Sequence, residues 1–301
     1  MKKVLVTGAA GFIGSHIVDE ALSYGYEVCG IDNLSTGKKE NVNSKCKFIG
    51  GDILSEDFEA HFGKVDGIFH TAALARIQPS FNSPVKYHST NVIGTLRLIE
   101  YAIRCNAKIV FSSSSSVYGV KGILSMPIDE EYPLNPSSPY ALQKRFCEQY
   151  LELFNRFYNL RYVTFRYFNV YGPRQIYDGS YAAVIGIFLD KYMKNQPFPI
   201  YGDGLQKRDF TFVKDVAKAN LMAFESDISS GVYNIGTGIN HSVVNVANYI
   251  SRDTSIDYLP ERLGEAKETL ADYRKAFTHF GWKPEIKLNE WLKDEVSKSR
   301  V

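Results

Sequence analysis

The residues near the amino terminus constrain the fold most, because a short apolar run leads directly into a glycine-rich turn and then a helix. Residues 3–7 predict a buried strand, Gly8-Ala-Ala-Gly11-Phe-Ile-Gly14 follows at once, and residues 15–22 predict a helix. Gly8 permits a tight turn, Gly11 lets the backbone approach a pyrophosphate, and Gly14 lets the helix pack closely on the strand. This order predicts a dinucleotide site with the phosphates at the helix N-terminus.

An acidic residue at the end of the next strand indicates which dinucleotide is bound. Residues 27–31 predict a strand that runs into Asp32, 18 residues beyond Gly14. A carboxylate here accepts hydrogen bonds from a ribose 2′-hydroxyl and repels a 2′-phosphate, which predicts NAD rather than NADP. A solvated loop aspartate would also fit this position. Residues 33–37 supply polar groups beside it, and Asp52, after a third strand at 46–50, could reach the adenine amino group.

The stretch Lys108–Lys144 contains residue types suited to proton transfer. Ile109-Val-Phe111 predicts a buried parallel strand that ends in five serines, at the sheet edge where α/β proteins bind ligands. Tyr140 and Lys144 stand four residues apart in a predicted helix and share one face. A nearby ammonium group lowers the pKa of a tyrosine, and a serine hydroxyl could bind the same substrate oxygen. The pair alone also occurs by chance, so its meaning depends on the serines and the glycine motif.

The order of predicted elements indicates the fold class. Strands and helices alternate over the first 165 residues, which predicts an α/β fold with a Rossmann-type, doubly wound parallel sheet. His70, at the end of the strand 65–69, is expected to be packed rather than catalytic. Beyond it we expect a helix over 89–102, a strand over 161–166, a loop over 171–181, a helix over 182–194, a strand over 208–213, a helix over 215–223 and a last strand over 232–236. The expected domains are a cofactor-binding domain at 1–168 and a smaller substrate-binding region at 169–301, with some segments returning to the first.

Composition excludes several other classes of protein. The chain has 301 residues and a formal net charge of +2 with scattered basic residues, which does not indicate a nucleic-acid-binding surface. The four cysteines lack metal-ligand spacing, so buried free thiols and no metal site are expected. No run reaches the roughly 18 apolar residues of a membrane span, and the first residues enter a glycine motif instead of a cleavage site. A cytoplasmic location is therefore expected, without membrane or nucleic-acid partners.

Taken together, the motifs resemble the extended short-chain dehydrogenase/reductases, within the group of nucleotide-sugar epimerases and dehydratases. The resemblance covers nearly the whole chain in order. The matching segments are Thr7–Gly14, Ile31–Leu34, Gly51–Ile53, His70–Ala73, Phe111–Gly119, Ser138–Lys144, Arg166–Pro173, Tyr201–Gly204 with Arg208-Asp209, and Pro260–Gly264. In related dehydratases an Asp-Glu pair follows the serine strand, whereas Ser115 and Ser116 stand here. The sequence is therefore most similar to the UDP-sugar 4-epimerases, which act through a transient 4-keto sugar.

The resemblance implies roles for individual residues. Tyr140 would be the base, with Lys144 and Ser114 assisting it. The NAD site implied in this way comprises Gly8, Gly11, Phe12, Ile13, Gly14, Asp32, Asn33, Ser35, Thr36, Gly37, Asp52, Ile53, Ala72, Ala73, Thr90, Ser112, Tyr140, Lys144 and Tyr167. The UDP-sugar site comprises Arg76, Ser114, Ser115, Tyr140, Asn169, Val184, Tyr201, Arg208, Arg262, Glu265 and Thr269. A homodimer is implied, formed through the helices at about 89–102 and 139–157.

Three residues bear on the substrate. In the family the position of Thr269, seven residues past Arg262, lies against the sugar C2 substituent, and a small residue there is similar to enzymes that accept N-acetyl sugars. UDP-GlcNAc/UDP-GalNAc is therefore expected, with UDP-Glc/UDP-Gal as a further pair. Arg76 is unusual for the family and could instead select a uronic acid, as in a UDP-glucuronate 4-epimerase, and Glu265 replaces a usual aspartate. A dTDP- or UDP-sugar 4,6-dehydratase and a non-catalytic NAD-binding sensor are less well matched by these motifs.

Overall fold

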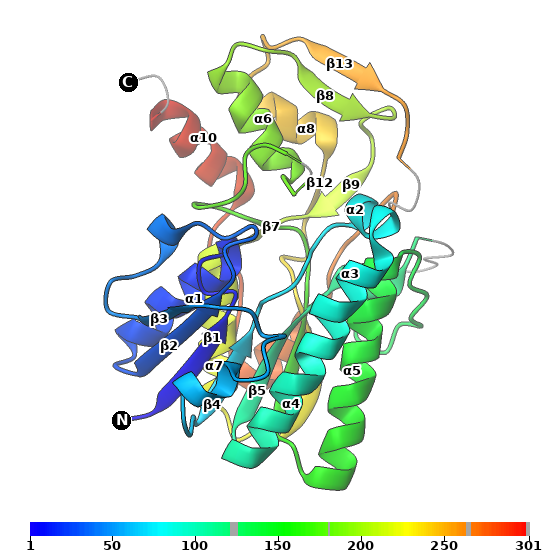
Figure 1. The fold of residues 1–301 in the computed structure, drawn as a ribbon. Helices are drawn as coiled ribbons and strands as arrows, with labels where there is room; N and C mark the ends of the chain where they lie inside the picture. Colours follow the sequence, from blue (N-terminus) through cyan, green and yellow to red (C-terminus); the bar gives the residue numbers. More distant parts are fainter. Residues whose placement is uncertain (121–125, 180, 263–265, 299–301) are drawn as a thin grey trace.

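A single parallel sheet forms the centre of the molecule (Figure 1). The computed structural model describes residues 1–120, 126–179, 181–262 and 266–298. Within them the sheet has seven strands in the order β11-β6-β5-β4-β1-β2-β3, and every neighbouring pair is parallel. The strands are β1 (Lys3–Thr7), β2 (Glu27–Asp32), β3 (Lys47–Gly50), β4 (Gly67–His70), β5 (Lys108–Ser114), β6 (Tyr162–Tyr167) and β11 (Ser230–Ile235). This confirms the predicted Rossmann-type fold.

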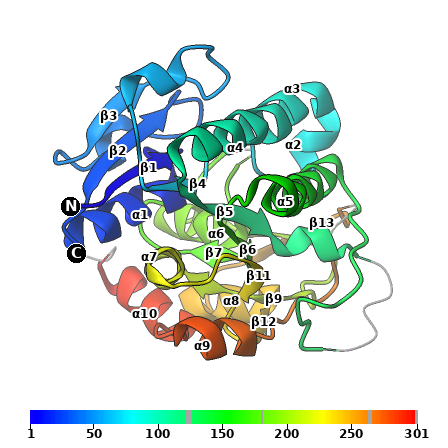
Figure 2. The ribbon, with the colours of Figure 1, turned by 90° about the horizontal axis from the view of Figure 1, so that it is seen from below.

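Helices cover both faces of this sheet, as Figure 2 shows from below. Side chains of α1, α7 and α9 share one apolar core with the sheet, and those of α4 and α5 share another. Helices α2 and α3 contact α5. The bounds are α1 (Phe12–Ser23), α2 (Ile77–Asn82), α3 (Pro84–His88), α4 (Gly94–Cys105), α5 (Pro139–Tyr158), α7 (Val213–Glu225) and α9 (Arg274–Phe280). The π-helical turn Ser89–Ile93 joins α3 to α4, so the helix expected over 89–102 is part of a longer helical segment.

A smaller region lies above the carboxyl ends of the main strands (Figure 1). Its core combines aromatic and aliphatic side chains from three helices and short strands. The elements are α6 (Val184–Met193), α8 (Val243–Ile250), α10 (Leu288–Lys298), β7 (Val170–Tyr171), β8 (Phe198–Tyr201), β9 (Lys207–Asp209), β10 (Thr211–Phe212), β12 (Asn240–Ser242) and β13 (Ile256–Leu259). Residues 213–235 and α9 lie in the main sheet layer instead, because α7 packs on α1 and β11 pairs with β6.

Three predicted strand boundaries differ from the structure. The strand expected over 208–213 is two strands, because the chain changes partner at Phe210: β9 pairs antiparallel with β12, and β10 pairs parallel with β7. The strand expected as the last one is followed by β12 and β13. Strand β5 continues through Ser114, since Ser112, Ser113 and Ser114 pair with the last three residues of β6. Serine has no strong preference for strands, so the pairing with β6 decides this boundary.

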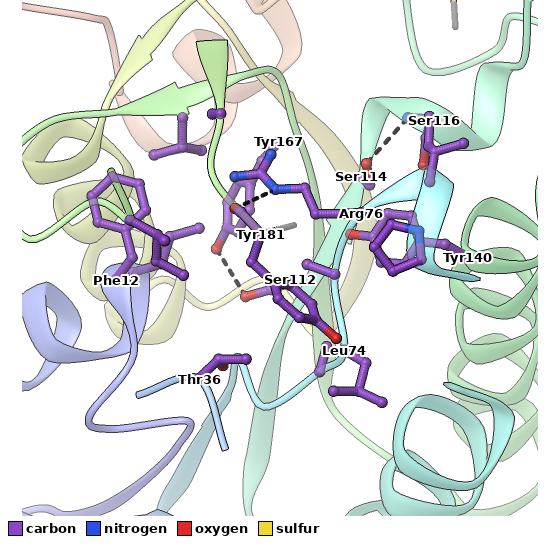
Figure 3. Close-up of a pocket in the computed structure, with 18 of the residues that line it drawn as sticks. Phe12, Thr36, Leu74, Arg76, Ser112, Ser114, Ser116, Tyr140, Tyr167 and Tyr181 are labelled. Carbon is purple, nitrogen blue, oxygen red and sulfur yellow. Dashed lines mark hydrogen bonds between the residues drawn. The ribbon is translucent and has the colours of Figure 1, made fainter. Parts of the chain in front are cut away.

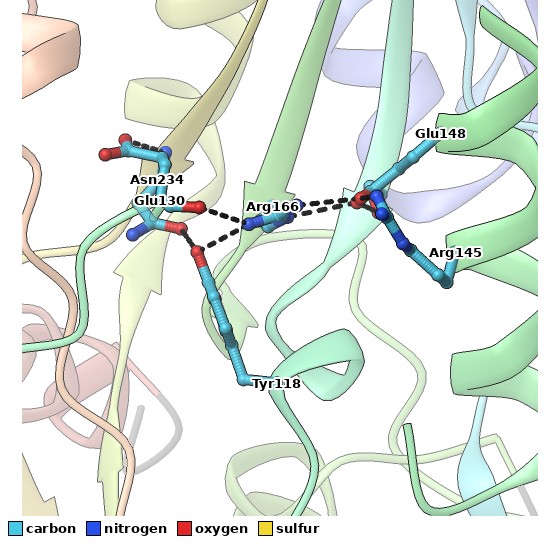
Figure 4. A network of polar contacts seen from close by, with 7 residues as sticks. Tyr118, Glu130, Arg145, Glu148, Arg166 and Asn234 are labelled. Atoms are coloured by element: carbon cyan, nitrogen blue, oxygen red, sulfur yellow. Dashed lines mark hydrogen bonds and ion pairs between the residues drawn. The ribbon is translucent and has the colours of Figure 1, made fainter. Parts of the chain in front are cut away.

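A buried ion pair fixes α5, the helix that begins next to Tyr140, against the sheet (Figure 4). The Arg166 guanidinium in β6 binds both carboxylate oxygens of Glu148 in α5, at 3.1 and 2.8 Å. Ser113 Oγ donates to the same carboxylate at 2.6 Å, and Arg166 also donates to the Tyr118 hydroxyl at 3.0 Å. The N-terminus of α5 is capped by Ser138, which accepts from the Ala141 N–H. Contacts on both sides of Tyr140 along the chain, at Ser138 and at Glu148, thus set its position.

Three further findings concern the cysteines, membrane spans and metal-binding groups. All four cysteines are buried. No helix of the described residues is long and apolar enough to cross a membrane. Among the same residues, no group of three or more His, Cys, Asp or Glu side chains is placed to hold a metal ion.

Candidate functional site

A cavity of about 850 Å³ lies between the carboxyl ends of the main strands and the smaller region (Figure 3). Its walls come from the loops after β1, β2, β4, β5 and β6 and from residues of α6, β8 and β9. This is the sheet edge at which the serine run and the glycine motif were expected to meet. Its volume lies toward the upper end of the range of about 300–1,000 Å³ that is typical of ligand pockets.

The glycine turn leaves no space for side chains between strand β1 and the loop after β4. Gly8 has a φ of +72°, and a Cβ there would lie 2.9 Å from the Ala72 amide nitrogen. A Cβ on Gly14 would lie 2.1 Å from the Gly8 carbonyl oxygen. The turn therefore packs closely on the loop after β4, and Gly11, Phe12 and Ile13 at the N-terminus of α1 line the cavity. Exposed N–H groups at a helix N-terminus suit a pyrophosphate.

Asp32 organises the two loops at the adenosine end of the cavity. Its carboxylate accepts from the Ala10 N–H at 3.0 Å and the Leu34 N–H at 2.8 Å. Burial raises the pKa of this carboxyl group, and these backbone hydrogen bonds oppose the rise. A carboxylate has about four acceptor positions, so acceptor capacity is left for a ribose hydroxyl. Asn33 donates to Asp52 at 2.9 Å, which joins two further predicted cofactor residues.

Most of the predicted cofactor residues line this cavity. They are Gly8, Gly11, Phe12, Ile13, Gly14, Asp32, Asn33, Ser35, Thr36, Asp52, Ile53, Ala72, Ala73, Thr90, Ser112, Tyr140, Lys144 and Tyr167. Gly37 is outside the lining, where a Cβ would lie 2.8 Å from an Asp32 carboxylate oxygen. The hydroxyl of Tyr167 is hydrogen-bonded to Asn220 and Ser112, so this side chain supports the wall. His70 is buried between Thr7 and Thr95, and burial lowers its pKa to about 3, which fits a packed neutral histidine.

Tyr140, Ser114 and Lys144 meet at the end of β5. Burial raises the pKa of Tyr140, whereas a hydrogen bond with Ser114 and the charge of Arg76 lower it. Ser114 Oγ accepts from the Ser116 N–H at 3.2 Å, which leaves its own proton to donate. The Lys144 amine donates to the Ser112 carbonyl at 2.6 Å and lies 4.7 Å from the Phe111 ring centroid. Burial lowers the pKa of Lys144 to about 8.

The other end of the cavity carries cations from distant parts of the chain. Arg76, Arg208 and Arg262 all line it, together with Asn169, Ser115, Val184, Tyr201 and Thr269. The Arg262 guanidinium lies 3.6 Å from the Tyr201 ring centroid. Thr269 Oγ1 accepts from the Asp209 N–H at 3.2 Å, so its hydroxyl proton can still be donated. Glu265, another predicted substrate residue, lies outside the described residues.

Sequence reasoning missed several residues of this site. The carboxylate of Asp209, fully buried, accepts four hydrogen bonds: from Thr237 N and Oγ1, Gly238 N and Ala271 N. It thereby joins β9 to two later loops. Tyr181, from the loop before α6, lines the cavity and accepts from Arg76 through its carbonyl. Ser116 also lines it, and its buried hydroxyl has no hydrogen-bond partner among the residues that the structure describes. The Arg208-Asp209 dipeptide could have indicated Asp209, and the serine run could have indicated Ser116. No feature of the sequence indicated Tyr181.

These features fit NAD: a helix N-terminus at the cavity, the Asp32 carboxylate with acceptor capacity left, and Lys144 and Tyr140 on the same cavity wall. The fold and the site thus define a dinucleotide-binding protein with Tyr140, Ser114 and Lys144 on its cavity wall. The model of the NAD-dependent epimerase/dehydratase family matches residues 4–236, and the chain belongs to that family. This confirms NAD as the cofactor and the resemblance found in the sequence.

Individual relatives match the whole chain. A protein of Methanocaldococcus jannaschii named a putative UDP-glucose 4-epimerase is 44% identical, over 98% of this chain and 97% of its own. The structure of UDP-glucose 4-epimerase from Thermotoga maritima with UDP-glucose has a TM-score of 0.94 at 39% identity, covering 99% of this chain and 98% of that one. UDP-N-acetylglucosamine 4-epimerase from Methanobrevibacter ruminantium, in complex with UDP-N-acetylmuramic acid, has a TM-score of 0.93 at 40% identity, covering 100% and 99%.

Proposed function

We propose that the protein is a UDP-sugar 4-epimerase that interconverts UDP-GlcNAc and UDP-GalNAc and also accepts UDP-Glc and UDP-Gal. The relatives support the reaction, and their names differ in the sugar. The observation that supports the N-acetyl sugars is Thr269, a small side chain on the cavity wall with a hydroxyl proton to donate. A larger residue at this place would fill the space that an acetamido group needs.

Tyr140 takes the proton of the sugar 4-hydroxyl as the C4–O bond becomes a carbonyl, and later returns a proton to the same oxygen. Ser114, whose oxygen already accepts from Ser116, donates to that oxygen and orients it. NAD, held at the glycine turn and Asp32, would supply the acceptor for the hydrogen and two electrons that leave C4 and would return them. Because epimerisation requires their return to the opposite face of C4, the cavity must let the 4-keto sugar turn over between the two steps.

The cations at this end fit the diphosphate of a UDP-sugar. Five cationic side chains line the described cavity, Arg76, Lys86, Lys144, Arg208 and Arg262, against the two carboxylates of Asp32 and Asp52. A guanidinium binds phosphate oxygens in a fixed geometry, so Arg208 and Arg262 are suited to this role. Asn169 supplies an amide on the same wall. The excess of positive charge is what a doubly charged diphosphate requires.

The sugar is tested by incubating purified protein separately with UDP-GlcNAc and UDP-Glc, without added NAD, and resolving the products by NMR. We expect both to be epimerised. Thr269→Tyr should suppress the reaction of UDP-GlcNAc far more than that of UDP-Glc, because the phenol occupies the acetamido space. Thr269→Ser, which keeps a small side chain and the hydroxyl, is the matched control and should retain both. Turnover of UDP-Glc alone by the native protein would contradict the proposed role of Thr269.

A UDP-uronic acid is a second candidate, favoured by one observation. Arg76 is an exposed residue that lines the cavity, and its positive charge suits a sugar carboxylate. Native protein that turns over only UDP-glucuronate would establish this substrate and leave the epimerase assignment in place.

We also propose a homodimer formed through α5 and the helical segment around α4. Four apolar side chains of α5 are exposed, Leu142 at 42%, Phe146 at 37%, Leu153 at 44% and Phe157 at 67%. Their spacing puts them on one face of the helix, and such a stripe is typical of a helix–helix interface. Sedimentation at micromolar concentration should give a dimer, and Phe146→Glu with Leu153→Glu should give a monomer; a native monomer would contradict the proposal.

A further inference from the structure

The loop that follows β7 begins with a tight turn whose backbone is unusual. The Gln175 N–H donates to the Gly172 carbonyl at 3.3 Å, which closes a four-residue turn. Pro173 and Arg174 occupy its centre, and Arg174 has a φ of +63°. Proline at the second position and a positive φ at the third are features of a type II turn, in which the third residue is normally glycine or asparagine. An arginine at this place must therefore be held by its surroundings.

The peptide between Pro173 and Arg174 is the part of the turn that has an alternative orientation. Type I and type II turns differ mainly in a rotation of this central peptide by about 180°, which reverses its carbonyl and changes the sign of φ at the residue that follows. Arginine by itself favours the negative φ of type I. The direction of the Pro173 carbonyl and the φ of Arg174 are thus two aspects of one choice.

Helix α1 contacts this peptide with two side chains of one face. His16 is buried, and its ring Nε2 lies 3.0 Å from the Pro173 carbonyl oxygen. A carbonyl oxygen only accepts, so Nε2 carries the proton and donates. Asp19, three residues further along the helix, pairs with the Arg174 guanidinium at 2.8 Å and accepts from Asn43 at 2.7 Å. The first contact fixes the carbonyl of the peptide, and the second fixes the side chain that follows it.

The residues after the turn form a wall of the cavity. Gln175 and Ile176 line it, and Val184, the first residue of α6, lines it as well. Helix α6 packs directly on this segment, because a Cβ on Gly186 would lie 2.3 Å from the Ile176 carbonyl oxygen. A reversal of the peptide at Pro173 would therefore shift both the segment and the start of α6. The glycine motif, which lies in another part of the chain, would keep its place.

We propose that His16 is a positioning residue for the UDP-sugar: its hydrogen bond holds the Pro173–Arg174 peptide in the type II orientation and thereby sets the wall that Gln175 and Ile176 form. The inference rests on the proposed function, which supplies the ligand of this wall. His16 is not among the described residues that line the cavity, so it acts through the turn. The pair of Asp19 with Arg174 is partly exposed, and such pairs contribute less than a buried hydrogen bond.

The first test measures KM and kcat of His16→Ala with whichever UDP-sugar the native protein turns over. Without the hydrogen bond the turn should populate the type I orientation, which does not bind the substrate well. KM should rise about three- to tenfold, the effect of one hydrogen bond on such an equilibrium, while kcat and the NAD content stay close to native. His16→Gln can still donate to the Pro173 carbonyl and should keep most of the native KM.

A matched control removes another hydrogen bond from a histidine to a distant segment. His279 Nδ1 lies 2.8 Å from the Tyr233 hydroxyl, and neither residue is part of the described cavity lining. His279→Ala should therefore leave KM native, even where it lowers the stability of the fold. A rise in KM as large as that of His16→Ala would show that KM reports on general stability, which would overturn the proposal.

A double variant distinguishes control of the turn from loss of packing. Glycine adopts a positive φ without steric cost, so Arg174→Gly favours the type II turn without help from His16. His16→Ala combined with Arg174→Gly should have a KM close to native, although it lacks both contacts to α1. A KM as high as that of His16→Ala, or higher, would overturn the proposal, because lost packing is not restored by removing a further side chain.

Crystal structures of the same variants report on the turn whatever the substrate is. In His16→Ala we expect a reversed Pro173 carbonyl and a negative φ at position 174, and in the double variant the native orientation. A type II turn retained in His16→Ala would overturn the role of His16, even where KM rises. Reversal of the peptide in a protein that turns over no UDP-sugar would instead overturn the proposed function and leave the control of the turn by His16 in place.

Discussion

The two ends of the cavity are built in opposite ways. The adenosine end uses Gly8 to Asp52, consecutive strand and helix units whose acidic groups are Asp32 and Asp52. The sugar and diphosphate end collects Arg76, Arg208 and Arg262 from segments separated by up to 186 residues. In the proposed function, the first end recognises the ribose of NAD by a local motif, and the second binds a diphosphate with charges that only the folded chain brings together. A change at one end should therefore leave binding at the other end largely intact.

A buried aspartate organises each end. Asp32 holds two backbone N–H groups of adjoining loops, and Asp209 holds three backbone N–H groups and the Thr237 hydroxyl. Burial raises the pKa of both carboxyl groups, and the hydrogen bonds oppose the rise. Neither carboxylate relies on an ion pair for these contacts. Both carboxylates fix neighbouring loops by accepting hydrogen bonds. The walls of the two ends are thus held in the same way, although the proposed ligands differ.

The largest effect is expected at the sugar end, from Tyr140→Phe. Removal of a general acid–base group lowers the rate by about 10²–10⁴-fold. The cofactor end should be unaffected, so the variant should still release NAD when denatured. The measurement is kcat by NMR together with the NAD content of the purified protein. Near-native turnover would show that another group transfers the proton, and Ser114→Ala, as a comparison, should cost less.

The second-largest effect is expected from the buried ion pair between Arg166 and Glu148, which holds α5 against the sheet below both ends of the cavity. Glu148→Gln leaves the buried Arg166 guanidinium without its charged partner, and breaking a buried pair costs about 3–5 kcal/mol. We expect a free energy of unfolding lower by that amount, measured in urea. Arg145→Gln removes only the partly exposed partner of the same carboxylate, at 3.4 Å, and should cost less than about 1 kcal/mol. Equal losses from both variants would contradict the dominant role of Arg166.

Asp209→Asn should perturb the sugar end alone. An amide presents N–H groups where the carboxylate accepts from Gly238 and Ala271, and a lost hydrogen bond to a charged group costs about 1.5–3 kcal/mol. Because Asp209 fixes the segment next to Thr269, KM for the UDP-sugar should rise while NAD content stays native. Asp203→Asn, in an exposed turn where the carboxylate accepts from Leu205, is the matched control. A fall in NAD content with unchanged KM would contradict the separation of the two ends.

The smallest effect is expected from Asp32→Asn, which tests the cofactor end. Loss of the negative charge weakens the hydrogen bonds to ribose and to the Ala10 and Leu34 N–H groups, by about tenfold in NAD affinity. It also removes the repulsion of a 2′-phosphate, so the preference for NADH over NADPH should narrow in fluorescence titrations. Asp52→Asn should change this preference less. Native protein that releases NADP on denaturation would refute the role given to Asp32.

The sequence determined much of the fold because the deciding interactions are local. Apolar runs of strand length, the spacing of Gly8, Gly11 and Gly14, and the i,i+4 placement of Tyr140 and Lys144 are properties of short segments, and the parallel sheet followed from their alternation. The same holds for Asp32, whose partners Ala10 and Leu34 come from the turn after β1 and the loop after β2, within one strand–helix–strand unit. The geometry of a local motif is set by its own residues, so it can be predicted without the rest of the chain.

Only the tertiary structure decided the features that join distant segments. Four such features link residues 28 to 105 positions apart. They are the pairing of β11 with β6, the change of strand partner at Phe210, the four hydrogen-bond donors to Asp209, and the hydrogen bond from Arg76 to the Tyr181 carbonyl. Lys144 was placed correctly on its helix face, yet the atom its amine meets, the Ser112 carbonyl, depends on how α5 packs on β5. Hydrogen bonds are short-ranged and directional, so shifts of about one ångström change which partner is met. Spacing along a chain does not fix distances at that scale between segments that meet only on folding.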